Sequence, residues 1–185
     1  QLATAAGMDP VQYRLRHLPH PRPIELIQAV ADKAGWRRRF GPQEDADGGL
    51  GDGGEILFGQ GFAYARYMHC AWPGFGAAWA AWVADVEVNR KTGEIHVRKV
   101  VVGHDAGMTI NPAGVEQQVH GNVIQATSRA LKEEVRFAKA PSTATADKLP
   151  GVLPTGAVAS REWGGYPIIN FREVPVIQVD AVHRP

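Results

Sequence analysis

Cysteine is nearly absent from this sequence, and several other signals are missing altogether. One cysteine among 185 residues excludes a disulfide framework and a zinc site built from thiolates. Cys70 stands among small and aromatic residues, which favours a buried, inert thiol over a nucleophile. No run of about 18 apolar residues occurs, so the sequence predicts no membrane span. Residues 1–4 show no signal peptide and no initiator methionine.

An excess of charge of one sign is also missing. Lysine and arginine number 20 against 19 aspartates and glutamates, which leaves a net charge of +1. Proteins that bind nucleic acids usually carry a basic surplus or stripe, so this balance argues against a nucleic-acid partner. The seven histidines include no pair with the helical spacing of a zinc protease, and no nucleophile-elbow motif occurs. The residues therefore identify no metal site and no catalytic residue.

Glycine and proline, by contrast, are abundant. They number 21 and 13, which predicts many turns and loops. The succession of patterns divides the chain into a helical N-terminal segment over residues 1–40, a glycine-rich loop over 41–55 and an α+β domain over 56–185. A further loop is predicted over 138–159, where small and polar residues show no periodicity.

The N-terminal segment predicts two helices. Asp9 is a favourable N-cap and Pro10 suits the first helical position. The proline-rich residues 19–23 cannot continue a helix, because proline lacks the N–H donor and crowds the preceding turn. A second helix follows, with one apolar face formed by Ile24, Ile27, Val30 and Ala34.

The middle of the chain predicts a β-hairpin. Strands over residues 78–89 and 94–104 carry alternating and β-branched apolar residues. Gly93 lies in the short loop between them and can take a positive φ. Two shorter strands are predicted over 167–171 and 174–182. Together with the helices, these strands indicate an α+β fold.

A long helix over residues 111–137 carries the most informative pattern. Asn111 followed by Pro112 is a strong helix start. Spacings of three and four place one polar stripe on a single side of this helix: Gln118, Gly121, Asn122, Gln125 and Arg129. A mid-helix glycine costs about 0.5–1 kcal/mol relative to alanine, so close approach by another backbone or by a ligand would explain Gly121. A solvated face and a surface that binds a polar heterocycle or phosphate both remain open.

Several stretches resemble the xanthine dehydrogenase/aldehyde oxidase family. Residues 101–112, 115–125 and 128–137 are similar to a motif of its molybdopterin-binding large subunit. The last of these stretches, with residues 166–171 and 173–175, is most similar to the bacterial branch typified by the isoquinoline 1-oxidoreductase β subunit. The resemblance extends over most of the chain.

The resemblance implies a function and a site. Such enzymes oxidise an N-heterocycle or an aldehyde with water as the oxygen source, using a molybdenum–pterin cofactor, here the cytosine dinucleotide form. It implies that Gln118 contacts the pterin, and Gly121 would allow close approach of the cofactor or of a neighbouring segment. The implied partners are an iron–sulfur small subunit, the rest of the large subunit and a small-molecule substrate. The expected fold is a mixed β-sheet with the hairpin of about 78–104 packed against the long helix of about 111–137.

The sequence also departs from the family. The catalytic base of the family is a glutamate in a Gly-x-Gly-Glu motif, which this sequence lacks. We therefore expect a C-terminal fragment of a larger subunit that binds no cofactor and has no activity alone. A non-catalytic binding or assembly module that keeps the fold is the alternative. The sequence leaves the compartment open between cytoplasm and periplasm.

Overall fold

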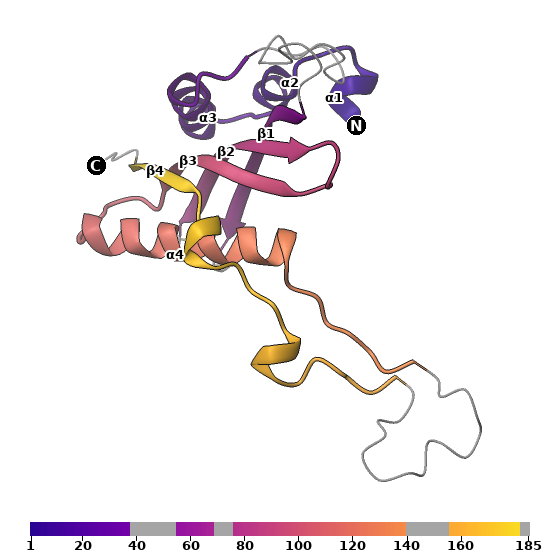
Figure 1. Cartoon of the computed structure of the whole chain (residues 1–185). Coiled ribbons are helices and arrows are strands. Elements are labelled where there is room, and N and C mark those ends of the chain that lie inside the picture. Colours follow the sequence, from indigo (N-terminus) through magenta and orange to yellow (C-terminus); the bar gives the residue numbers. More distant parts are fainter. Residues whose placement is uncertain (38–54, 69–75, 140–155, 182–185) are drawn as a thin grey trace.

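The protein is built around one sheet with helices on both faces (Figure 1). The structure, a computed structural model, describes residues 1–37, 55–68, 76–139 and 156–181. The predictions for Cys70 and for most of the two predicted loops lie outside the described residues.

Four strands form a mixed sheet, in the order β1 (Ile56–Met68), β2 (Ala77–Asn89), β3 (Ile95–Asp105) and β4 (Val176–Ala181). The first three strands pair antiparallel, and β4 pairs with β3 in parallel. The predicted α+β fold and the hairpin are confirmed, and Gly93 takes a φ of +74° in the turn between β2 and β3. A parallel neighbour requires a crossover connection, and the long helix supplies it.

The predicted helix start at Asp9 is confirmed in α2 (Pro10–Arg16). One carboxylate oxygen of Asp9 accepts hydrogen bonds from the backbone N–H groups of Val11 and Gln12, both at 3.0 Å. The other oxygen accepts a bond from the indole Nε1 of Trp36 at 3.0 Å. Asp9 is 1% exposed, so one buried carboxylate both caps α2 and ties it to the chain that follows α3.

The start of the second helix differs from the prediction. Helix α3 spans Pro21–Lys33, so three residues of the proline-rich run, Pro21, Arg22 and Pro23, form its first turn. Proline is tolerated there because first-turn N–H groups have no partner within the helix. A short helix that the pattern did not predict, α1 (Leu2–Ala5), precedes α2.

Each face of the sheet has its own core. On one face, Leu26, Ile27 and Val30 of α3 are fully buried against β2 and β3. Gly103 of β3 permits this close approach, because a Cβ there would lie 2.8 Å from Leu26 Cδ1 and would overlap Val30 Cγ2. On the other face, the buried apolar side chains of α4 (Pro112–Leu131) pack against the sheet: Val119 and Val123.

The long helix is shorter than predicted. It ends at Leu131, and residues 132–136 are irregular. Side chains of the returning chain engage the residues just after this end: Lys132 pairs with Glu173 at 2.7 Å, and Tyr166 donates a hydrogen bond to Glu133 at 2.8 Å. These tertiary contacts replace the helical continuation, so the prediction of helix over 132–137 is wrong.

The predicted strand over residues 167–171 is also wrong. Asn170 caps a 3₁₀ helix, η3 (Phe171–Glu173), in a capping box with Glu173. The backbone N–H of Ile169 donates to Ser128 Oγ at 3.3 Å instead of to a neighbouring strand. A local capping box and a hydrogen bond to the distant Ser128 thus take the place of strand pairing here. The next predicted strand is confirmed as β4, with Ile177 and Val179 packed against the α4 core and Val176 exposed.

Candidate functional site

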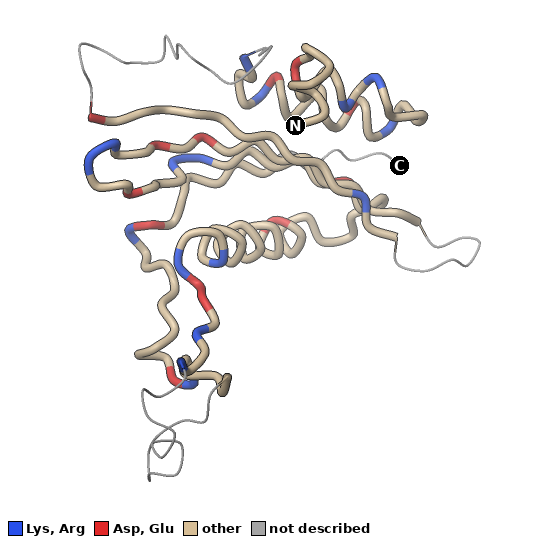
Figure 2. The backbone as a smooth tube through the Cα atoms, turned by 90° about the vertical axis from the view of Figure 1, so that its right-hand side faces the viewer, with Lys and Arg blue, Asp and Glu red and all other residues tan. Residues whose placement is uncertain are grey.

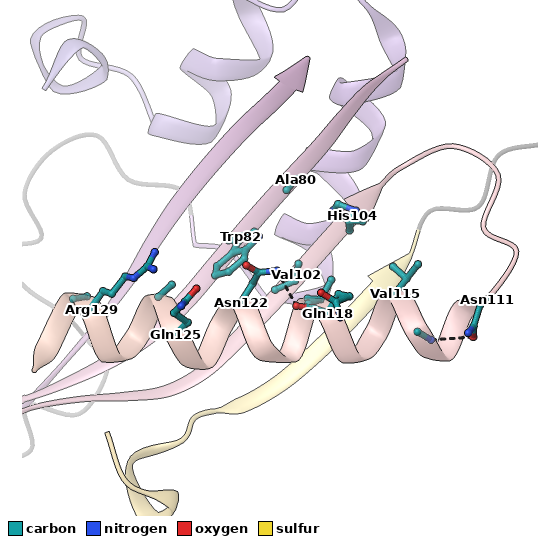
Figure 3. A pocket seen from close by; sticks show the side chains of 14 residues that line it. Ala80, Trp82, Val102, His104, Asn111, Val115, Gln118, Asn122, Gln125 and Arg129 are labelled. Carbon is teal, nitrogen blue, oxygen red and sulfur yellow. Dashed lines mark hydrogen bonds between the residues drawn. The ribbon is translucent and has the colours of Figure 1, made fainter. Parts of the chain in front are cut away.

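A large cavity lies between helix α4 and the sheet (Figure 3). Its volume is about 1120 Å³. One wall comes from α4 and the other from β2 and β3, whose contributions include Ala80, Trp82, Val102 and His104. A second, smaller cavity of about 230 Å³ lies between α2 and α3 on the opposite face of the sheet.

The polar stripe of α4 faces the large cavity. Val119 and Val123 hold the helix against the sheet, and this contact turns the neighbouring side of the cylinder toward the cavity. Four of the five stripe residues line it: Gln118, Asn122, Gln125 and Arg129. Figure 3 shows their side chains along the helix, with Arg129 at one end and Asn111 at the other.

Neutral amides dominate the polar lining. The Asn122 Nδ2 donates to the backbone carbonyl of Gln118 at 2.8 Å, which leaves its carbonyl oxygen for other partners. Amide side chains can donate and accept, so they suit a polar heterocycle, and a guanidinium suits a phosphate. The described lining residues include no aspartate or glutamate, so no fixed negative charge of this wall would repel an anionic ligand.

Gly121 does not line this cavity. It is exposed, and a Cβ built on it would meet no atom of the described residues within 4 Å. The close approach of a neighbouring segment is therefore not seen among the described residues. Contact of Gly121 with a ligand stays a prediction.

The end of β3 adds a residue that the polar stripe did not reveal. His104 lines the cavity, whereas its neighbour Asp105 points to the α3 face. Strand alternation explains this division, because successive side chains point to opposite faces. Because the two side chains lie on opposite faces of the sheet, they do not form a catalytic dyad. Strand alternation alone could have assigned His104 to the wall that faces α4.

Asp105 fixes the chain where it enters the site. The carboxylate is 1% exposed and accepts two hydrogen bonds from the guanidinium of Arg22, from Nε at 2.5 Å and Nη2 at 2.6 Å. It also accepts from the backbone N–H of Gly107 at 3.0 Å. Hydrogen bonding to Arg22 holds the pKa of Asp105 below its ordinary value, against the opposing effect of burial. The Arg22 guanidinium also lies 5.1 Å from the ring centre of Trp79.

The fold is an α+β domain with an amide-lined cavity on one face of its sheet, and comparison with known proteins identifies its family. Residues 54–175 match the family model described as molybdopterin cofactor-binding domain, so the chain belongs to that family. More narrowly, it is a molybdopterin-binding part of the xanthine dehydrogenase family of molybdenum oxidoreductases.

Two curated relatives align with nearly the whole chain. One of them, a nicotinate dehydrogenase subunit of Pseudomonas putida, is 54% identical over 185 residues, which cover 100% of this chain and 14% of the relative. The other, the β subunit of isoquinoline 1-oxidoreductase of Brevundimonas diminuta, is 31% identical over 183 residues, which cover 98% of this chain and 19% of the relative. The chain thus spans less than a fifth of the length of either relative.

Solved structures support the fold. The reconstituted CO dehydrogenase from Oligotropha carboxidovorans superposes with a TM-score of 0.50 at 22% identity, covering 62% of this chain and 12% of that one. In the part of the chain that the structure describes, no three histidine, cysteine or acidic side chains are grouped to hold a metal ion. No helix among the described residues is both long and apolar enough to cross a membrane.

Proposed function

We propose that the cavity between α4 and the sheet holds part of the molybdenum–pterin cofactor, with Gln118 as the main contact to the pterin. The alignment of four polar stripe residues along one wall carries this proposal. The cavity is at least as large as typical small-molecule sites, which are roughly 300–1,000 Å³. Its neutral amides match the donors and acceptors of a pterin ring, so the residues present fit the group.

The residues of this chain would bind and orient the cofactor. Gln118 and Gln125 make no side-chain hydrogen bond among the described residues, so their amides remain available to a ligand. Trp82 and Val102 form an apolar wall on the opposite side of the cavity. When bound, the molybdenum group supplies the oxidation of the substrate with water as the oxygen source.

The Arg129 end of the cavity supports a proposal on the form of the cofactor. We infer that the cofactor is the cytosine dinucleotide form, with a phosphate paired to Arg129. A guanidinium offers two parallel donors to a phosphate, and Trp82 offers an aromatic face near that end. Hydrolysis of the isolated cofactor and chromatography of the released nucleotide test this form. Release of a different nucleotide, or of none, would contradict it.

The reaction needs groups beyond the described lining. We propose that the base and the substrate site come from the rest of a larger subunit, so that the isolated chain has no turnover. We propose an N-heteroaromatic substrate, because the two curated relatives are named for nicotinate and isoquinoline. An iron–sulfur small subunit would accept the electrons. Turnover of nicotinate, isoquinoline or an aldehyde by the purified chain would refute the inactivity.

Substitution of Gln118 tests the site directly. In the full-length subunit, Gln118→Ala should lower the molybdenum and pterin content about 3–10-fold, which corresponds to the loss of one net hydrogen bond. Gln117→Ala is the matched control, because Gln117 is exposed on the same helix but does not line the cavity. Equal cofactor content in both variants would contradict the assignment. A folded full-length parent without molybdenum would favour the non-catalytic module instead.

A further inference from the structure

Two segments form an arm that projects from the body of the protein. We use "the arm" for residues 132–139 and 156–173, which leave the end of α4 and return to β4. Figures 1 and 2 show from two directions that it extends away from the sheet and α4. A bridge between Phe137 and Val158 joins the two segments, supported by a hydrogen bond from the Ala138 N–H to the Ala157 carbonyl at 2.8 Å.

The arm exposes large apolar side chains. Phe171 is 99% exposed and Trp163 is 81% exposed. Further apolar side chains along the arm are also exposed: Val135, Phe137, Val158 and Ile168. Scattered single apolar residues are normal on a surface, but six on one short projection mark an interaction site.

Most charged side chains of the arm, in contrast, already have partners within the chain. Figure 2 shows both signs interspersed along the arm, without a field of one sign. The contacts that satisfy them are Lys132 with Glu173, Arg136 with Glu134, Tyr166 with Glu133, and Arg161 with the carbonyl of Val158. Apart from the exposed charges of Lys139, Glu162 and Arg172, the surface that the arm leaves without partners is apolar, so it suits a mainly uncharged protein surface rather than an ion or a nucleic acid.

The base of the arm is anchored, so its position relative to the cavity is fixed. Ser128, 4% exposed in α4, accepts the hydrogen bond from the Ile169 N–H, and Ile169 is 8% exposed. The helix that carries the polar stripe thus also carries the anchor of the arm. A surface that seats on the arm would be held beside the same helix.

We propose that the arm docks onto the remainder of the molybdenum-binding subunit, an inference that rests on the proposed function. The family match extends over residues 54–175 and so includes the arm. The alignments with the whole chain cover only 14% and 19% of the two curated relatives, so most of such a subunit lies outside these residues and is available to cover the arm. The large, rigid aromatics Trp163 and Phe171 would be the anchors of the interface.

Photo-crosslinking from the arm tests this inference in the full-length subunit assembled with its small subunit. Phe171→p-benzoylphenylalanine keeps an aromatic side chain at a 99% exposed position, so the fold should tolerate it. Trp163→p-benzoylphenylalanine provides a second, independent position. Mass spectrometry should find the main crosslinks in the same polypeptide, at residues outside the 185 of this chain.

A control residue separates docking from mere exposure. Phe58→p-benzoylphenylalanine places the probe on β1, where the native side chain is 46% exposed and lies outside the arm. The crosslinks from this position should fall mainly within this chain, because about half of the surface of the Phe58 side chain is already covered by neighbouring residues of the chain. Crosslinks from both arm positions to the small subunit, to a second copy, or to this chain alone would overturn the proposal. The cofactor content of the same preparations reports separately on the proposed function.

Discussion

The ion pair between Arg22 and Asp105 should be a main source of stability for the chain segment at the end of β3, beside the large cavity. Replacement Arg22→Met keeps much of the apolar stem but leaves a carboxylate at 1% exposure with only the Gly107 N–H as a donor. Breaking a buried pair in this way costs about 3–5 kcal/mol. Because the Arg22 side chain is 35% exposed, water screens part of the interaction, and we expect about 2–4 kcal/mol.

The effect should depend on pH in a defined direction. The pKa of Asp105 is lowered in the folded protein. The ion pair therefore stabilises the folded state at pH values above the ordinary pKa of aspartate, about 3.9. This stabilisation is lost as the pH falls through the lowered pKa. Urea unfolding at about pH 7 should therefore show a large difference in the free energy of unfolding between wild type and Arg22→Met. This difference in the free energy of unfolding should become smaller as the pH falls below about 4.

Two further variants make this reasoning refutable. Arg22→Met combined with Asp105→Asn removes the uncompensated charge, so it should be more stable than Arg22→Met alone at neutral pH. Arg90→Met removes an exposed arginine from the hairpin turn and should change stability by no more than about 0.5 kcal/mol. The reasoning would be refuted if wild type and Arg22→Met differed little in free energy of unfolding at neutral pH. It would also be refuted if that difference did not change with pH, because Asp105 would then not be buried and charged.

Two other predictions concern packing and the arm. Gly103→Ala should destabilise the protein by about 1–3 kcal/mol in urea unfolding, because the added methyl group overlaps Val30. Gly59→Ala is the control, because the added methyl group meets open space there and should cost far less. Equal costs for the two variants would contradict the tight contact at Gly103. The hydrogen bond to Glu133 raises the pKa of Tyr166. Glu133→Gln should therefore lower the pKa of Tyr166, as measured by NMR titration of the tyrosine ring. An unchanged titration would show that this contact at the base of the arm is absent in solution.

Local patterns predicted much of this fold because the relevant forces act within a few residues. Strand alternation and Gly93 specified the hairpin, and Asp9 with Pro10 specified the start of α2. Helical spacing placed four polar residues on one wall of a real cavity. These features depend on side-chain direction along a single element, which the sequence encodes directly.

The failures share a different cause. The end of α4 at Leu131 depends on Glu173 and Tyr166, which lie more than thirty residues further along the chain. The backbone at Ile169 bonds to Ser128 of α4 instead of extending a strand. Such contacts between distant segments override local propensity, and periodicity within one segment does not report them.

The two faces of the sheet have different roles, and the end of β3 couples them. The α3 face is closed by Leu26 and Val30 against Gly103, with no space for a single methyl group. The α4 face leaves a cavity of about 1120 Å³. Because neighbouring residues alternate, Asp105 bonds to Arg22 on the closed face while His104 lines the cavity on the open one. Tight packing on one face therefore fixes the strand that forms a wall of the cavity on the other.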